Sequence, residues 1–141
     1  TLNTTVGVIA GWNDVTFDTI DWNNGPWTYT TGSADILLNS PGTEAGIFGL
    51  FGWVKFSPNS SGAVALRFRR ENLGGAVSAE MPVALKAITG APADGGAILP
   101  FFFSYELGTQ TVAFRLQADQ EGAPSTDIKS ASLGLIRLRR Y

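Results

Sequence analysis

Turn-forming residues interrupt this sequence so often that they limit it to short extended elements. Seventeen glycines and seven prolines are spread over 141 residues, and no sustained stretch has the apolar spacing of an amphipathic helix. Short runs rich in Val, Ile, Phe, Trp and Thr recur instead, separated every eight to twelve residues or so by Gly, Pro or Asn. This spacing is typical of a sandwich or barrel, so we expect an all-β fold.

The runs between these turns define the expected strands. They are Val6–Ala10, Trp12–Phe17, Ala34–Leu38, Gly46–Phe56, Val64–Arg70, Met81–Thr89, Pro100–Leu107, Thr111–Gln117 and Ser132–Arg139. A chain of this length has the common size of one domain, so residues 1–141 are expected to form a single core.

Two of these strands are apolar on both faces. Side chains alternate along a strand, so Gly46–Phe56 places apolar side chains on both faces of the sheet. Pro100–Leu107 does the same, and both strands therefore need to be buried on both faces. Burial on both sides is compatible with a thick core within one chain, with a dimer or with a higher oligomer. The candidate subunit contacts are Ile47, Phe51, Trp53, Phe101, Phe103 and Tyr105.

Arginines alternate with apolar residues on two further strands. Val64, Leu66 and Phe68 alternate with one set of arginines, and Ile136 and Leu138 with another. We expect the arginines to face outward, where guanidinium groups suit carboxylate recognition, although a solvated face is an equally good interpretation. The candidate partner-binding arginines are Arg67, Arg69, Arg137 and Arg139.

Composition excludes several kinds of chemistry. The chain contains no Cys and no His, which removes disulfides, thiolate metal sites, cysteine nucleophiles and the usual general base. The net charge of -2 makes nucleic acid a poor partner, and no apolar run is long enough for a spanning helix, so we expect no membrane insertion. We expect no cofactor, no metal and no catalytic residue. The chain is therefore expected not to be an enzyme.

Three weaker interpretations remain open. Asp18 and Asp21 precede Trp22 and give the carboxylate pair in an aromatic setting that a two-carboxylate glycosidase needs, although a loop whose aspartates cap its own turns is the favoured interpretation. Asp94, Asp119 and Glu121 offer oxygen ligands for a surface Ca²⁺. The alternative is that these residues belong to ordinary turns that bind no ion. Loop aromatics can stack on a sugar or bind a receptor, although they more often cover a core; these candidates are Trp12, Trp22, Trp27 and Tyr29.

Several segments together resemble a known superfamily. They are Trp12–Thr19, the Pro41-Gly42 turn with the glycine-and-aromatic run Ile47–Val54, Phe56–Gly62, Ala65–Arg70 and Ser132–Leu138. Their order is similar to the jelly-roll domains of the tumour-necrosis-factor and complement globular-head (C-one-q type) superfamily, and the phage and bacterial versions look most alike. The chain departs from the complement type in having no collagen-like stalk and no cysteine.

The resemblance implies a jelly-roll sandwich of about eight to ten antiparallel strands in a tight homotrimer, with the doubly apolar strands as trimer contacts. It implies a bacteriophage virion protein made in the host cytoplasm and placed on the virion surface, and the favoured role is a capsid decoration protein that binds the capsid protein. Residues 1–10 would then be an arm or edge strand. The alternatives are the receptor-binding head of a fibre, recognising host glycan or protein, and a carbohydrate-binding or carbohydrate-active module.

Overall fold

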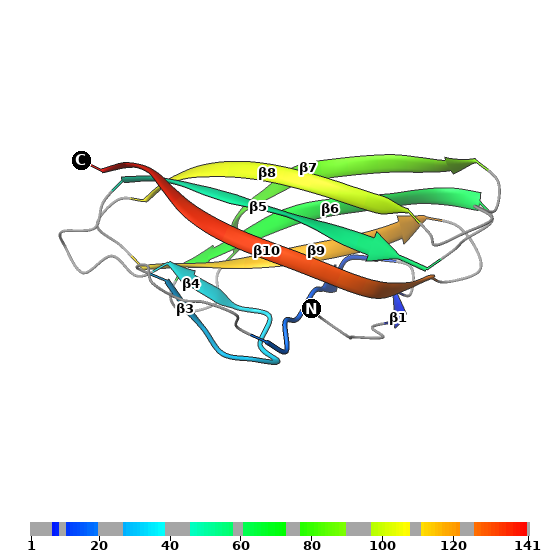
Figure 1. Cartoon of the computed structure of the whole chain (residues 1–141), viewed down its shortest axis with the longest axis horizontal. Coiled ribbons are helices and arrows are strands. Elements are labelled where there is room, and N and C mark those ends of the chain that lie inside the picture. Colours follow the sequence, from blue (N-terminus) through cyan, green and yellow to red (C-terminus); the bar gives the residue numbers. More distant parts are fainter. Residues whose placement is uncertain are drawn as a thin grey trace.

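The computed structural model shows an all-β protein built from two sheets (Figure 1). It describes residues 7–8, 11–19, 27–38, 46–57, 61–72, 77–89, 97–107, 111–121 and 126–140. Within these ranges the chain forms strands β1 to β10 and no helix, and every strand pair is antiparallel. The all-β expectation is thus confirmed.

The first sheet has the order β1-β10-β5-β8. Its strands are β1 (Gly7–Val8), β10 (Thr126–Arg140), β5 (Gly46–Phe56) and β8 (Ile98–Leu107). The second sheet has the order β3-β4-β9-β6-β7, with β2 also paired to β9. Its strands are β2 (Asn13–Asp14), β3 (Trp27–Tyr29), β4 (Ile36–Leu38), β6 (Ser61–Asn72), β7 (Val77–Thr89) and β9 (Val112–Glu121).

The core lies between the two sheets. Alternate residues of β5, β6 and β9 point into it, because side chains on a strand face opposite sides in turn. The largest fully buried side chains are Phe48, Phe56, Phe68, Phe114, Ile36, Leu38, Leu50, Leu66, Leu116 and Ile128. Phe68 lies at the centre, with its ring centroid 5.5 Å from that of Phe101 on the opposite sheet.

Most expected strands agree with the structure, and β5 has the same bounds as its prediction, Gly46–Phe56. One strand is absent from the expected set, because Trp27 and Tyr29 are expected in a loop. The segment in fact pairs with β4 from Trp27↔Leu38 to Tyr29↔Ile36. Three residues are too few to show an alternating pattern in the sequence, so only pairing identifies this strand.

Candidate self-association surface

The outer face of the first sheet carries an apolar strip across three strands. Phe51 on β5 pairs with Phe102 on β8 and with Gly134 on β10, and the rows on either side pair Trp53 with Pro100 and Gly49 with Ile136. The residues that we call the apolar strip are Ile47, Phe51, Trp53, Ile98, Pro100, Phe102, Ile136 and Leu138.

Large side chains of the strip are open to solvent in the single chain. Phe102 is 58% exposed, Phe51 42% and Leu138 48%, and Ile98 and Ile136 are exposed to a similar extent. A contiguous apolar patch on the surface of a soluble protein commonly marks an interaction site. The strip therefore has the character of an interface rather than of a solvated sheet face.

Two glycines keep the strip flat, because aromatic rings from the neighbouring strand pack directly over them. A Cβ atom at Gly134 would stand 2.5 Å from Cζ of Phe51, and one at Gly49 would stand 3.1 Å from Cε2 of Phe102. The rings thus occupy the spaces that side chains at these glycines would fill. A flat face of this kind suits close packing against another surface, because sheets pack face to face at a spacing of about 10 Å.

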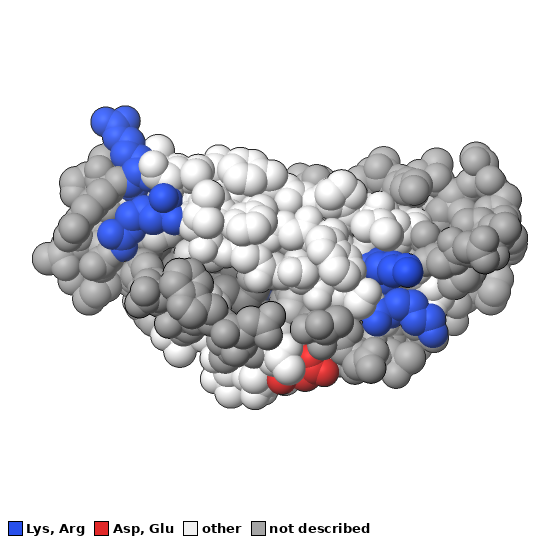
Figure 2. All heavy atoms as spheres, in the orientation of Figure 1, with Lys and Arg blue, Asp and Glu red and all other residues white. Residues whose placement is uncertain are grey.

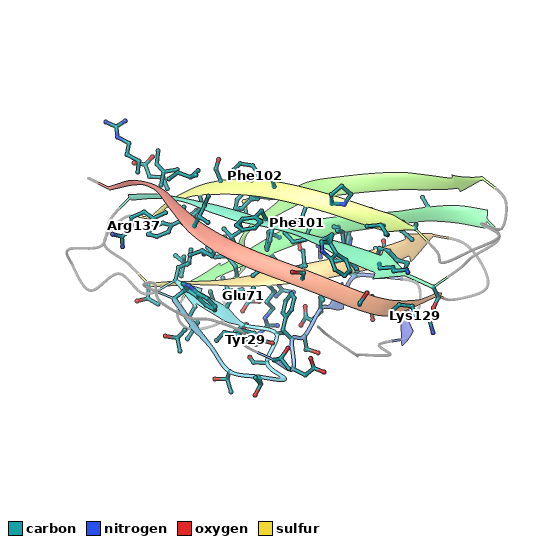
Figure 3. The ribbon with its side chains drawn as sticks, viewed as in Figure 1. Tyr29, Glu71, Phe101, Phe102, Lys129 and Arg137 are labelled. Carbon is teal, nitrogen blue, oxygen red and sulfur yellow. The ribbon has the colours of Figure 1, made fainter. Side chains whose placement is uncertain are left out.

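Basic side chains stand at both ends of the strip, and uncharged residues lie between them (Figure 2). Lys129 lies near one end of β10 and Arg137 near the other (Figure 3). Lys55 pairs with Ser130 at the lysine end. At the arginine end, Arg139 and Glu106 both pair with Ile47.

The outer face of the second sheet carries polar side chains that form ion pairs and hydrogen bonds with one another. Arg115 on β9 donates from Nε to Asp35 Oδ1 at 2.6 Å, and its Nη1 lies 3.4 Å from Asp14 Oδ2. Its Nη2 lies 3.6 Å from the buried Glu71. The hydrogen bond to Asp35 raises the pKa of Arg115 above its ordinary value, and nearby Glu71 and Asp14 add to this. Arg115 thus connects β9 to β2, to β6 and to the residue that precedes β4.

A second part of this network runs toward β7. Arg67 donates from Nε to Gln117 Oε1 at 2.8 Å and lies 2.8 Å from Glu80, and its guanidinium stacks 4.2 Å from the ring centroid of Trp12. Gln117 in turn donates to Asp14 at 2.7 Å. The two outer faces therefore differ in kind: one carries a network of ion pairs and hydrogen bonds, and the other carries an exposed apolar strip.

Solved structures that share this fold include two ligands of the TNF type. Murine APRIL at pH 5.0 superimposes with a TM-score of 0.58 over 95% of this chain and 94% of that chain, at 12% identity. Eiger TNF from S. frugiperda gives a TM-score of 0.52 over 97% of this chain and 91% of that one, at 15% identity. The fold is a TNF-like jelly roll. At these identities the likeness concerns the fold alone.

The sequence itself matches no protein-family model and no curated protein. The jelly-roll fold that the residues lead us to expect is confirmed by these superpositions.

The expected contacts on β8 of this jelly roll require a correction. Phe101, which we expected at a subunit contact, is only 6% exposed and lies against Phe68 inside the sandwich. Phe103 and Tyr105 lie on the same inner side and pack against the core. Phe102 faces outward instead (Figure 3). With apolar residues on both faces of the run, only packing decides which set is inside. Ile47, Phe51 and Trp53 do lie on the outer face.

The alternation on β10 is also the reverse of the expectation. Ile136 and Leu138 are exposed on the outer side, while Arg137 turns toward the sandwich end, with its guanidinium 5.4 Å from the ring centroid of Phe48. The guanidinium tolerates this position because it lies over the aromatic ring, whose face attracts a cation. Arg139 does lie outward, because an irregularity between Arg137 and Arg139 shifts the register.

The candidate partner-binding residues on the second sheet have structural partners. Arg67 is engaged as described above, and Arg69 Nε lies 3.0 Å from Glu71, without hydrogen-bond geometry. These contacts favour a structural role for both arginines.

The candidate loop aromatics that the structure describes pack against other residues of the chain. Tyr29, expected on an exposed loop, is 8% exposed. Its hydroxyl accepts the backbone N–H of Phe17 at 2.6 Å and lies 2.6 Å from the carbonyl oxygen of Ser33. Burial raises the pKa of Tyr29 above its ordinary 10.0. Trp27 lies on β3, partly buried against the core, and Trp22 lies outside the described residues.

The candidate carboxylate sites are not assembled in the part of the chain that the structure describes. Asp18 is exposed, and Asp21 and Asp94 lie outside the described residues, as does the side chain of Glu121. Asp119 accepts the N–H of Gly11 at 3.1 Å. Among the described residues no group of three or more acidic side chains is placed to hold a metal ion. The same ranges contain no helix long and apolar enough to cross a membrane.

Proposed function

We propose that this chain is a non-enzymatic structural protein of a bacteriophage virion, which assembles into a homotrimer and decorates the surface of the capsid. The observation that carries the proposal is the apolar strip, since an exposed and flattened apolar sheet face indicates burial against another surface. In the proposed assembly this surface belongs to a second copy of the chain, and the trimer presents its remaining surface to the capsid protein.

The shape of the strip limits how two copies can meet. From Ile47 to Trp53 it is roughly 20 Å long, and its three strands span about 10 Å. Two strips that cross at a right angle would overlap over only about half of this area. To cover the whole strip, the strands of the second copy must therefore be nearly parallel or antiparallel to those of the first.

The charges at the ends of the strip disfavour packing one strip on another. A two-fold axis along the strands would place Lys55 and Lys129 of both copies together. A two-fold axis across them would place these lysines near Arg139 at the other end of the strip. Like charges in contact oppose association. These features support a heterologous contact between two different surfaces, which gives a ring when it closes.

The number three is taken from the resemblance to the TNF and complement-head superfamily. Decoration is favoured over a receptor-binding fibre head, because the buried Tyr29 cannot serve a loop-borne binding site. The absence of His and Cys from the sequence, and the pairing of Asp14, Asp35 and Glu71 with Arg115, support a role without catalysis.

Light scattering over a dilution series tests the assembly. We expect a mass three times the 15.0 kDa of the chain, and a folded monomer for Phe102→Glu, which places a charge in the strip. Thr30→Asp is the matched control, because it adds a carboxylate at an exposed position outside the strip. A wild-type monomer at all concentrations, or a Phe102→Glu variant with unchanged mass, would argue against the interface.

The virion role is tested on particles purified by density gradient. Quantitative mass spectrometry is expected to find the chain in fixed stoichiometry with the capsid protein, in a multiple of three. Recombinant trimer added to particles that lack it should bind and then sediment with them. Particles without the chain, or capsids that do not bind it, would contradict decoration and leave a fibre head as the alternative.

A further inference from the structure

We propose that the edge of β10 accepts an extended, acid-flanked segment of a partner protein, which adds to the first sheet as a new strand. From Ile128 to Arg140, β10 pairs with β5 along one side. Along its other side, the described pairing is confined to Thr126 and Asp127, which face β1. β1 lies beside one end of β10 only (Figure 1), and shows that this edge accepts an antiparallel strand.

Burial along β10 shows that the sandwich is incompletely covered there. On the inner side, Leu135 is only partly buried, although Leu50, its partner on β5, is fully buried. Leu133 is likewise only partly buried. On the outer side of the same stretch, Ile136 is 44% exposed and Leu138 48%. The inner side chains of an added strand would cover Leu133 and Leu135, and its outer side chains would extend the apolar strip beyond Ile136 and Leu138.

The positive charge of this edge favours a partner segment that carries carboxylates. Residues 128–140 include Lys129, Arg137, Arg139 and Arg140 and no carboxylate. A second copy of β10 would therefore bring cations against cations, which opposes pairing. A segment with an apolar middle and carboxylates at its ends matches both the leucines and the basic ends. Main-chain hydrogen bonds would supply affinity, and the alternate side chains would supply selectivity.

This inference deepens the proposed function, because it names how a capsid partner would be held, but it does not depend on the trimer. The edge lies on β10, whereas Phe102 lies on β8, at the other side of β5. The Phe102→Glu variant therefore separates strand addition from self-association.

The probe is a synthetic peptide, acetyl-Glu-Val-Thr-Val-Ile-Val-Thr-Glu-amide, labelled for fluorescence anisotropy. We expect it to bind wild-type protein and Phe102→Glu alike, at least tenfold more tightly than the same peptide with Lys in place of both Glu residues. Hydrogen exchange should slow for amides within residues 129–138. In the Phe102→Glu background, Lys129→Glu should lower the affinity for the acidic peptide and raise the affinity for the basic peptide.

A peptide with Pro at its central Val is the control for strand pairing, because Pro removes a ladder donor. Binding that survives this change, binding without preference between acidic and basic peptides, or no binding up to millimolar peptide would overturn the inference. If the peptide fails while light scattering still finds the trimer, strand addition is wrong and the assembly stands. Peptide binding to a wild-type protein that stays monomeric would support strand addition and contradict the trimer.

Discussion

The ring of Phe51 lies over Gly134, at the place where a side chain on position 134 would stand. A Cβ atom there would be 2.5 Å from Cζ and 2.9 Å from Cε2 of the ring. The two residues face each other across β5 and β10, so the aromatic ring covers the gap that glycine leaves in the sheet. This pairing is what keeps the centre of the apolar strip flat.

Gly134→Ala is expected to leave the fold intact and weaken self-association. Phe51 is 42% exposed, so its ring can swing outward, and the free energy of unfolding should change by less than about 1 kcal/mol. The displaced ring would then stand above the strip and prevent close packing. Chemical denaturation and light scattering measure the two effects, and an unchanged dissociation profile would show that flatness does not matter.

Gly52→Ala is the contrasting case. A Cβ atom at Gly52 would collide with the backbone carbonyl oxygen of Ser132 and approach Phe101 to 3.0 Å. Backbone cannot swing away as a side chain does, so we expect a loss of about 3 kcal/mol or more. A variant that denatures at the wild-type midpoint would refute the close approach of β5 and β10 at this residue.

Tyr29→Phe is expected to destabilise the protein by about 1–3 kcal/mol, because the buried N–H of Phe17 loses its acceptor. The effect should depend on pH. Burial raises the pKa of Tyr29 in the folded chain, so above about pH 10 the unfolded chain loses this proton first and the wild type loses stability. The difference in unfolding free energy between wild type and variant should therefore narrow above pH 10. A difference that stays constant to pH 11 would contradict this.

Arg115→Gln is expected to lower stability by about 1–3 kcal/mol. It leaves the buried Glu71 with Arg69, leaves Asp14 with Gln117, and removes the ion pair with Asp35. Hydrogen exchange should increase in β2 and β4, whose short pairings with β9 flank Arg115. Asp18→Asn, at an exposed carboxylate, is the control. Equal exchange in the two variants would show that Arg115 does not hold these strands.

Deleting residues 1–8 removes β1, which pairs with β10 through Gly7 and Val8. In the proposed decoration protein these residues form a second contact with the capsid beside the β10 edge, so we expect the deletion to weaken capsid binding while the trimer mass is retained. Cosedimentation with capsids and light scattering measure the two properties. Unchanged capsid binding would remove the N-terminal segment from the partner contact.

The inner and outer sets of β5 agree with the sequence-based prediction, and those of β8 and β10 do not. In β5 both sets are apolar, and the outer one carries Phe51 and Trp53, as predicted. In β8, Phe101 and Phe102 are chemically equivalent, and only the contact with Phe68 decides which is inside. In β10, the alternating arginines predict an outward face, but Arg137 reaches the open end of the sandwich over Phe48.

The polar network of the second sheet is largely invisible in the sequence. Arg115 is separated from Asp14 by 101 residues and from Asp35 by 80, and no local pattern connects them. The acid-only character of residues 1–54 is a weak signal, because it indicates that these carboxylates need basic partners elsewhere. Which arginine they meet depends on the order of β2, β4 and β9 in the sheet.

By itself the sequence determined the all-β class, the positions of most strands and the presence of more apolar surface than one sheet face needs. These are local properties, since turn residues and alternation act over a few neighbours. Only the tertiary structure decided which set of side chains is buried, where Arg115 finds its carboxylates, and that the surplus surface forms one strip between two basic ends. Those outcomes depend on strand order and register, which bring together residues far apart in the chain.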